Sequence, residues 1–208
     1  MHPARYLGSL ALVLAASGAA LAASPSDEHF TFQLFPNPAF VACLTADGGK
    51  PPTVTVTVRR GLRNDHLRVV LKHFKSKIGF DLFTVQRSPQ LANGDPDAGF
   101  TNFGLAWYQS DVETSRHPSK AEIDTILLDQ IFGFDPDVQL SPTQTLHVGL
   151  WFNAPADAAP CGFTGTTPFN GEHNAGPLAF ISRPDATTGL GPLCTNPNTS
   201  TIPATCNP

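Results

Sequence analysis

An acidic and a basic side chain stand next to each other at Glu172 and His173, in a polar loop bounded by two glycines. Together they could supply a general acid and base, or two ligands of a metal ion. Neighbouring side chains of an extended segment point to opposite sides, so the two converge only where the loop turns. Asp111 and His147 are the further candidates for a hydrolase that uses carboxylates or a metal. A hydrogen-bonded surface loop explains the segment more simply, so we assign no catalytic residue and expect no metal and no cofactor.

Aromatic and amide side chains offer a second kind of chemistry, the recognition of a sugar. Trp107, Tyr108 and Gln109 are consecutive, and Trp151 lies in another apolar segment with the same alternation. Flat rings cover the apolar faces of a sugar, while amide groups bond to its hydroxyls. Large aromatic side chains more often belong to a core, yet these four residues are the best candidates for a ligand-binding face. A carbohydrate is therefore one predicted ligand.

The sequence contains none of the local signatures of common enzyme classes: no Gly-x-Ser-x-Gly, no His-Glu-x-x-His, no phosphate-binding loop and no dinucleotide-binding motif. The stretch 93–97 offers oxygen ligands at alternate positions, as calcium loops do. However, Ala98 and Gly104 stand where such a loop needs glycine and glutamate, so we favour a turn. The leading hypothesis is a secreted non-catalytic module that binds an extracellular or envelope ligand. A secreted hydrolase and a structural envelope protein are the alternatives.

In much of the sequence, apolar and polar side chains alternate with a period of two. The elements that this pattern predicts must position the candidate residues. From Thr53 to Arg60, three valines alternate with threonines, which is typical of a half-buried strand. Similar short segments recur between turn residues, at 67–72, 80–86, 100–109, 145–152 and 178–182. This spacing predicts an all-β fold, an antiparallel β-sandwich of the immunoglobulin-like or jelly-roll-like type. From Asn153 onward, glycine, proline, asparagine and threonine are frequent, so we expect long C-terminal loops.

The segment 119–131 fits two kinds of element. Ser119 and Glu122 have the spacing of a helix capping box, and the apolar residues after them include a helical pattern. The same residues also alternate with a period of two. Their β-branched side chains and the neighbouring strands favour a strand from Ala121 to Leu128.

The N-terminal residues have the pattern of a secretory signal peptide. Arg5 precedes an apolar run, and Ala20 and Ala22 flank Leu21 as a signal peptidase requires. We expect residues 1–23 to be removed and residues 24–208 to form a single domain. The apolar run is too short to cross a bilayer, so a secreted or periplasmic location without a membrane span is predicted. With a formal net charge of −4, the chain lacks the basic character of a nucleic-acid-binding protein.

In an exported chain, an even number of cysteines indicates disulfides, and the four residues Cys43, Cys161, Cys194 and Cys206 predict two. We favour Cys194 with Cys206, because the stretch between them is almost free of apolar residues. That choice leaves Cys43 with Cys161. The other two pairings stay open.

Three segments, 81–86, 104–111 and 146–152, resemble those of exported bacterial proteins. The resemblance implies no particular activity, substrate or site. A surface polymer or carbohydrate stays the expected partner, and the sequence leaves the oligomeric state open.

Overall fold

The computed structural model describes residues 29–46, 48–59, 64–104, 106–114, 120–128, 145–165 and 175–194. The predicted signal peptide lies outside these residues, as do Glu172, His173 and Cys206. The predictions made for them are therefore not tested by the structure.

The described chain is mostly β, and every strand pair is antiparallel. The strands are β1 (His29–Pro36), β2 (Thr53–Arg59), β3 (Asn64–Lys72), β4 (Gly79–Val85), β5 (Ala106–Glu113), β6 (Lys120–Leu128), β7 (Thr145–Phe152), β8 (Leu178–Ile181) and β9 (Leu193–Cys194). Short helical turns lie between them at α1 (Val41–Leu44), α2 (Pro155–Ala158) and η1 (Ala159–Cys161). In the region after Asn153, the strand predicted at 178–182 is β8, and the parts predicted to be long loops also contain the two helical turns α2 and η1 and the short strand β9.

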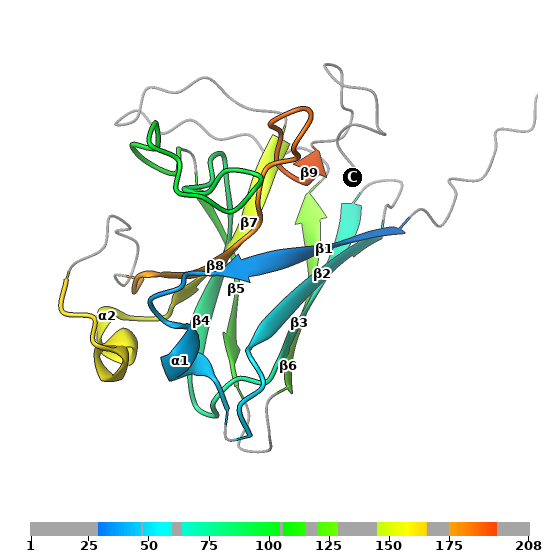
Figure 1. Cartoon of the computed structure of the whole chain (residues 1–208). Helices are drawn as coiled ribbons and strands as arrows, with labels where there is room; N and C mark the ends of the chain where they lie inside the picture. Colours follow the sequence, from blue (N-terminus) through cyan, green and yellow to red (C-terminus); the bar gives the residue numbers. More distant parts are fainter. Residues whose placement is uncertain are drawn as a thin grey trace, which may run out of the picture.

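The strands form one continuous path in the order β5-β4-β7-β8-β1-β2-β3-β6, and β9 pairs with β7 (Figure 1). Strand β1 joins the two halves, because its residues 29–34 pair with β2 and its last two residues pair with β8. The first and last strands of this path, β5 and β6, lie close together, so the sheet is nearly barrel-shaped. The predicted sandwich of two separate sheets is not confirmed.

Local sequence explains most of the strands. In β2 the three valines are buried and the threonines face outward, as their alternation predicts. The ambiguous segment is strand β6, which pairs with β3 over nine positions from Lys120 to Leu128. The capping box at its start does not produce a helix, because the edge of β3 supplies partners for the backbone. Strand β5 begins at Ala106 rather than at Phe100, so Phe100 and Phe103 belong to the loop before it.

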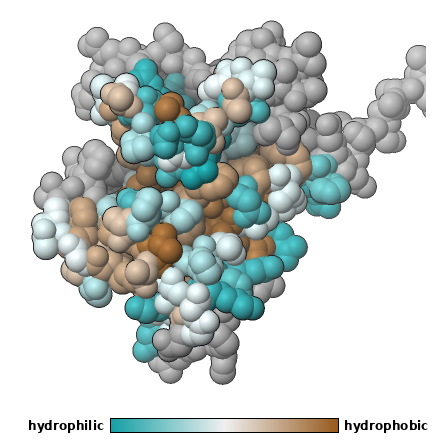
Figure 2. Space-filling model, viewed as in Figure 1, coloured by the Kyte–Doolittle hydropathy of each residue, from teal (hydrophilic) through white to brown (hydrophobic). Residues whose placement is uncertain are grey.

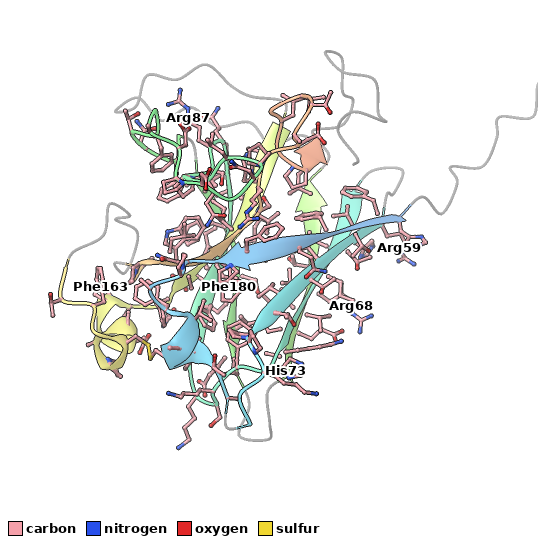
Figure 3. The ribbon with its side chains drawn as sticks, viewed as in Figure 1. Arg59, Arg68, His73, Arg87, Phe163 and Phe180 are labelled. Atoms are coloured by element: carbon pink, nitrogen blue, oxygen red, sulfur yellow. A yellow bond between two sulfur atoms is a disulfide. The ribbon has the colours of Figure 1, made fainter. Side chains whose placement is uncertain are left out.

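Two apolar clusters lie on opposite faces of the sheet. The interior contains aliphatic side chains from most strands together with packed rings, such as Phe74 and Phe180, whose centroids are 5.3 Å apart. Phe180 lies in this interior in Figure 3. A smaller cluster on the outer face, around Trp151 and Ile181, is covered by the loop 86–104. Trp151 therefore packs within the molecule, against Phe83 and Phe103.

One disulfide is present among the described residues, between Cys43 of α1 and Cys161 of η1. Their Cα atoms are 5.3 Å apart across a sequence separation of 118 residues. The bridge matches one of the two predicted pairs and ties the chain after β1 to the turn after β7. The second predicted pair includes Cys206, which the structure does not describe.

Candidate functional site

A groove of about 310 Å³ opens between strand β1 and the chain that follows β8. Its walls are Phe32, Gln33 and Phe35 of β1, Ala92 of the loop after β4, and residues 182–186 with Pro192. We call it the β1 groove. Figure 1 shows β1 in blue crossing the front of the molecule, with the orange segment after β8 rising away from it. In Figure 2 apolar surface is visible in the hollow between the upper loops and the body below them.

The groove exists because β8 stops pairing with β1 after two residue pairs, Phe35 with Ile181 and Pro36 with Phe180. Three positions after Ile181, Pro184 cannot donate a backbone hydrogen bond. Asp185 then turns the chain, since its Oδ1 accepts hydrogen bonds from the backbone N–H groups of Thr187 and Thr188 at 3.0 and 2.8 Å. These bonds lower the pKa of the Asp185 carboxyl, so it is ionised at neutral pH. The first part of β1 is left with β2 as its one strand neighbour among the described residues.

Arg183 brings a fixed positive charge to the rim of the β1 groove. Its guanidinium carbon lies 3.8 Å above the centre of the Phe35 ring, a cation–π arrangement. Its Nε donates a hydrogen bond of 2.9 Å to Oε1 of Gln90. The guanidinium group also packs on the backbone at Gly94, where a Cβ atom would collide with it. Within the described part of the chain Arg183 forms no salt bridge, so its charge is held in position without a neutralising carboxylate.

The predicted sugar-binding residues do not form one face. Trp151 is only 1% exposed, which removes it from any surface platform. Tyr108 is 50% exposed and packs its ring against Phe83. Trp107 pairs with Thr84, whereas Tyr108 pairs with Phe83, and adjacent positions of a strand face opposite sides. Gln109 donates to the hydroxyl of buried Thr84 at 3.0 Å and so belongs with Trp107.

Tyr108 lies near the carboxylates of Asp111 and Asp81. Burial of its hydroxyl and a hydrogen bond to the Asp111 carboxylate raise the pKa of Tyr108 to about 12. The phenol therefore stays protonated at every physiological pH. With its proton donated to Asp111, the hydroxyl oxygen can accept a hydrogen bond and the ring can offer one face, which is a small recognition surface rather than a reactive group.

The candidate catalytic residues are not brought together. His147 is 4% exposed and pairs with Val85, whereas Asp111 is exposed and pairs with Asp81. The two positions on β4 are four residues apart, roughly 13 Å along a strand. Burial lowers the pKa of His147 to about 4, so its ring is neutral at neutral pH. Glu172 and His173 lie outside the described residues.

The stretch 93–97 uses its oxygen atoms in turns. Nδ2 of Asn93 donates to Oδ2 of Asp95 at 2.7 Å, and Oδ1 of Asp97 accepts from the backbone N–H of Gly99 at 2.8 Å. The described residues contain no group of three or more side chains placed to hold a metal ion.

The residues that define the β1 groove were not selected from the sequence. The segment His29–Pro36 does carry a signal, because Phe30, Phe32 and Leu34 alternate with polar residues in the first eight positions of the fold. Nothing comparable marks Arg183, since its role depends on Phe35 and Gln90, which are distant in the chain.

Comparison of the chain with protein-family models, with curated proteins and with solved structures finds no match. Function is therefore argued from the geometry of the site.

Proposed function

We propose that the protein is an exported, non-catalytic binding module and that its ligand occupies the β1 groove. The observation that carries this proposal is the placement of Arg183, whose guanidinium is clamped between Phe35, Gln90 and Gly94 with no salt bridge among the described residues. These contacts hold the guanidinium in one position at the rim of the groove. It is ready to receive an anionic group without a large loss of side-chain entropy.

A binding role is favoured over the rival hydrolase because the charged side chains that line the groove in the described chain, Arg183 and Asp185, lie beside no accessible nucleophile, and the Asp185 carboxylate already accepts hydrogen bonds from the backbone. Ser182 and His147 are close to it, but both are almost completely buried. The Ser182 hydroxyl accepts a hydrogen bond from the backbone of Val148, which lowers its nucleophilicity. A hydrolase would need an accessible nucleophile or a base within reach of the substrate.

Export of the chain is supported by two features. A long-range disulfide such as Cys43–Cys161 is typical of proteins that fold in an oxidising compartment. The predicted signal peptide at residues 1–23 would direct the chain there, to the periplasm or the exterior. None of the helices in the described residues is long and apolar enough to cross a bilayer.

The lining of the groove indicates the chemistry of the ligand. Phe32, Phe35, two prolines and two alanines supply apolar surface, and Arg183 supplies the positive charge. The ionised Asp185 carboxylate also lines the groove, but it accepts hydrogen bonds from the N–H groups of Thr187 and Thr188. The best-matched ligand has an apolar body and a carboxylate or similar anionic group. A sugar is the second candidate, and it would bind at Tyr108, where an exposed ring lies beside the Asp111 carboxylate.

The proposal is tested with 3-phenylpropionate, which carries one ring and one carboxylate, in a titration followed by backbone amide resonances. We expect shifts at Phe35 and at Ser182, Arg183, Asp185 and Ala186, the residues of 182–186 that carry an amide proton, and at least a tenfold weaker affinity for Arg183→Ala. Arg87→Ala is the matched control, because Arg87 is exposed, points outward in Figure 3 and does not line the groove. Shifts that are absent from 182–186, or equal in both variants, would contradict the proposal. Shifts at Tyr108 with a neutral disaccharide would favour the second candidate.

A further inference from the structure

We propose that the β1 groove takes an extended peptide, which adds as an antiparallel strand to the edge of β1 at Gln33 and Thr31, where no described strand pairs, with an acidic residue next to Arg183. This inference rests on the proposed function and specifies the partner of that same site. Edge addition is a common way to bind peptides, because main-chain hydrogen bonds supply affinity and side-chain pockets supply specificity.

The direction of the backbone groups in β1 follows from its pairing with β8. The backbone N–H of Asn37 donates to the carbonyl of Ala179 at 2.7 Å, so the odd-numbered positions face this edge. Phe35 is still paired, with Ile181. The next two odd positions, Gln33 and Thr31, direct their N–H and C=O groups at the edge where the described chain places no strand. Gln33 lines the groove.

The side chains of β1 present two different faces to an added strand. Phe30 and Phe32 point toward the interior and pack on its apolar cluster, with ring centroids 6.1 Å apart, yet both are only partly buried. Thr31 and Gln33 point outward and bond to Thr57 and Thr55 of β2. A peptide with alternating side chains would therefore cover the two rings with its apolar residues and keep its polar residues outside.

The position of Arg183 sets the place of the acidic residue. Continuing the register of Phe35 with Ile181, the first peptide residue lies opposite Gln33, and its side chain points outward like that of Gln33. Arg183 lies on this outer face, above the ring of Phe35. A carboxylate at the first position would thus meet the guanidinium.

The exposed edge also favours a partner on general grounds. An unpaired edge is usually protected by charged side chains or by a covering loop, because it otherwise pairs with other chains. The outward residues of β1 along the open part are Thr31 and Gln33, which carry no charge. A second copy of this chain is the competing occupant of such an edge.

The probe is the peptide acetyl-Asp-Val-Thr-Val-Thr-amide, together with versions that have Ile, Leu or Phe at the two valine positions. In this register its aspartate faces Gln33, its valines cover Phe32 and Phe30, and its central threonine faces Thr31. We expect binding to slow hydrogen exchange at the amides of Gln33 and Thr31. Replacing aspartate by lysine should weaken binding at least tenfold, and Arg183→Ala should have the same effect on the aspartate peptide.

Backbone methylation gives the matched control. An N-methyl group on the central threonine blocks a hydrogen bond to β1 and should abolish binding, whereas one on the first valine points away and should be tolerated. Equal effects of the two modifications, or unchanged exchange at Gln33 and Thr31 for every peptide, would overturn the inference. So would protection of these amides without peptide in a protein that sediments as a dimer. If 3-phenylpropionate still binds at residues 182–186, the proposed function stands although the peptide inference fails.

Discussion

The Nδ1 atom of His147 lies 3.1 Å from both the carbonyl oxygen and the hydroxyl oxygen of Ser182. A ring protonated at Nδ1 donates to these oxygens, while the hydroxyl also accepts the backbone N–H of Val148 at 3.1 Å. Because Ser182 directly precedes Arg183, this buried pair fastens β7 to the wall of the β1 groove. The neutral histidine is thus a structural residue at the base of the proposed site.

Acid should destabilise the protein through His147. Its pKa is about 4 in the folded chain and about 6.5 when unfolded, so between these values the unfolded chain binds more protons. The contribution to stability is complete above about pH 6.5 and is lost as the pH falls toward 4. The full loss is on the order of 3 kcal/mol, measured by urea unfolding at each pH.

The variant His147→Asn removes the titrating group and keeps a donor near the position of Nδ1. Its free energy of unfolding should vary less between pH 6.5 and 4 than that of the wild type. His66→Asn is the control, because the His66 side chain is exposed on β3. An unchanged pH profile in His147→Asn would show that other groups cause the acid sensitivity.

A methyl group at Gly149 should disturb the outer apolar cluster. A Cβ at this position would lie 2.5 Å from Cζ3 of Trp151 and 3.1 Å from the carbonyl oxygen of Phe180. Overpacking of this kind costs about 1–3 kcal/mol, so Gly149→Ala should lower the urea midpoint. In a Trp151→Phe background the larger ring is gone, and the cost of Gly149→Ala should fall. Strictly additive effects of the two changes would contradict the contact.

Short-range patterns predicted the strands better than their arrangement. The alternation in 53–60 and 67–72 identifies β2 and β3, because each strand buries one face and exposes the other. The alternation of Phe30, Phe32 and Leu34 also indicates strand β1, which the prediction from the sequence leaves out. The sandwich was predicted from strand spacing alone. In the structure β1 pairs with both β2 and β8. This pairing depends on contacts between distant parts of the chain, which the spacing of strands in the sequence does not reveal.

The candidate site illustrates the same limit. The sequence identifies Trp107, Tyr108 and Trp151 as aromatic candidates. It does not show that Trp151 is buried beneath the loop 86–104. The loop covers Trp151 through Phe103, which the sequence pattern places in a strand and the structure places in the loop before β5. Arg183 has no local motif, and its position comes from Phe35, 148 residues earlier in the chain.

The two apolar clusters should respond differently to truncation. Leu150 is fully buried in the interior, so Leu150→Ala should cost about 2–5 kcal/mol through lost burial and a remaining cavity. Phe83 lies in the outer cluster, partly buried between Tyr108 and Trp151. Phe83→Ala should therefore cost less, about 1–2 kcal/mol. Leu91→Ala, at an exposed position, should leave the urea midpoint unchanged, and equal losses at Leu150 and Phe83 would contradict the assignment.

The cysteines allow a prediction for the Cys43–Cys161 bridge and for the predicted Cys194–Cys206 bridge. Cys43→Ser with Cys161→Ser releases a loop of 118 residues, which in the chain-entropy model costs about 5 kcal/mol. Cys194→Ser with Cys206→Ser would release only about 12 residues and should cost about 3 kcal/mol. Both double variants avoid an unpaired thiol.

Mass spectrometry of the denatured, unreduced wild type should find no cysteine that reacts with iodoacetamide. Labelling at Cys194 or Cys206 would show that the second bridge is absent, whereas labelling at Cys43 or Cys161 would contradict the structure itself.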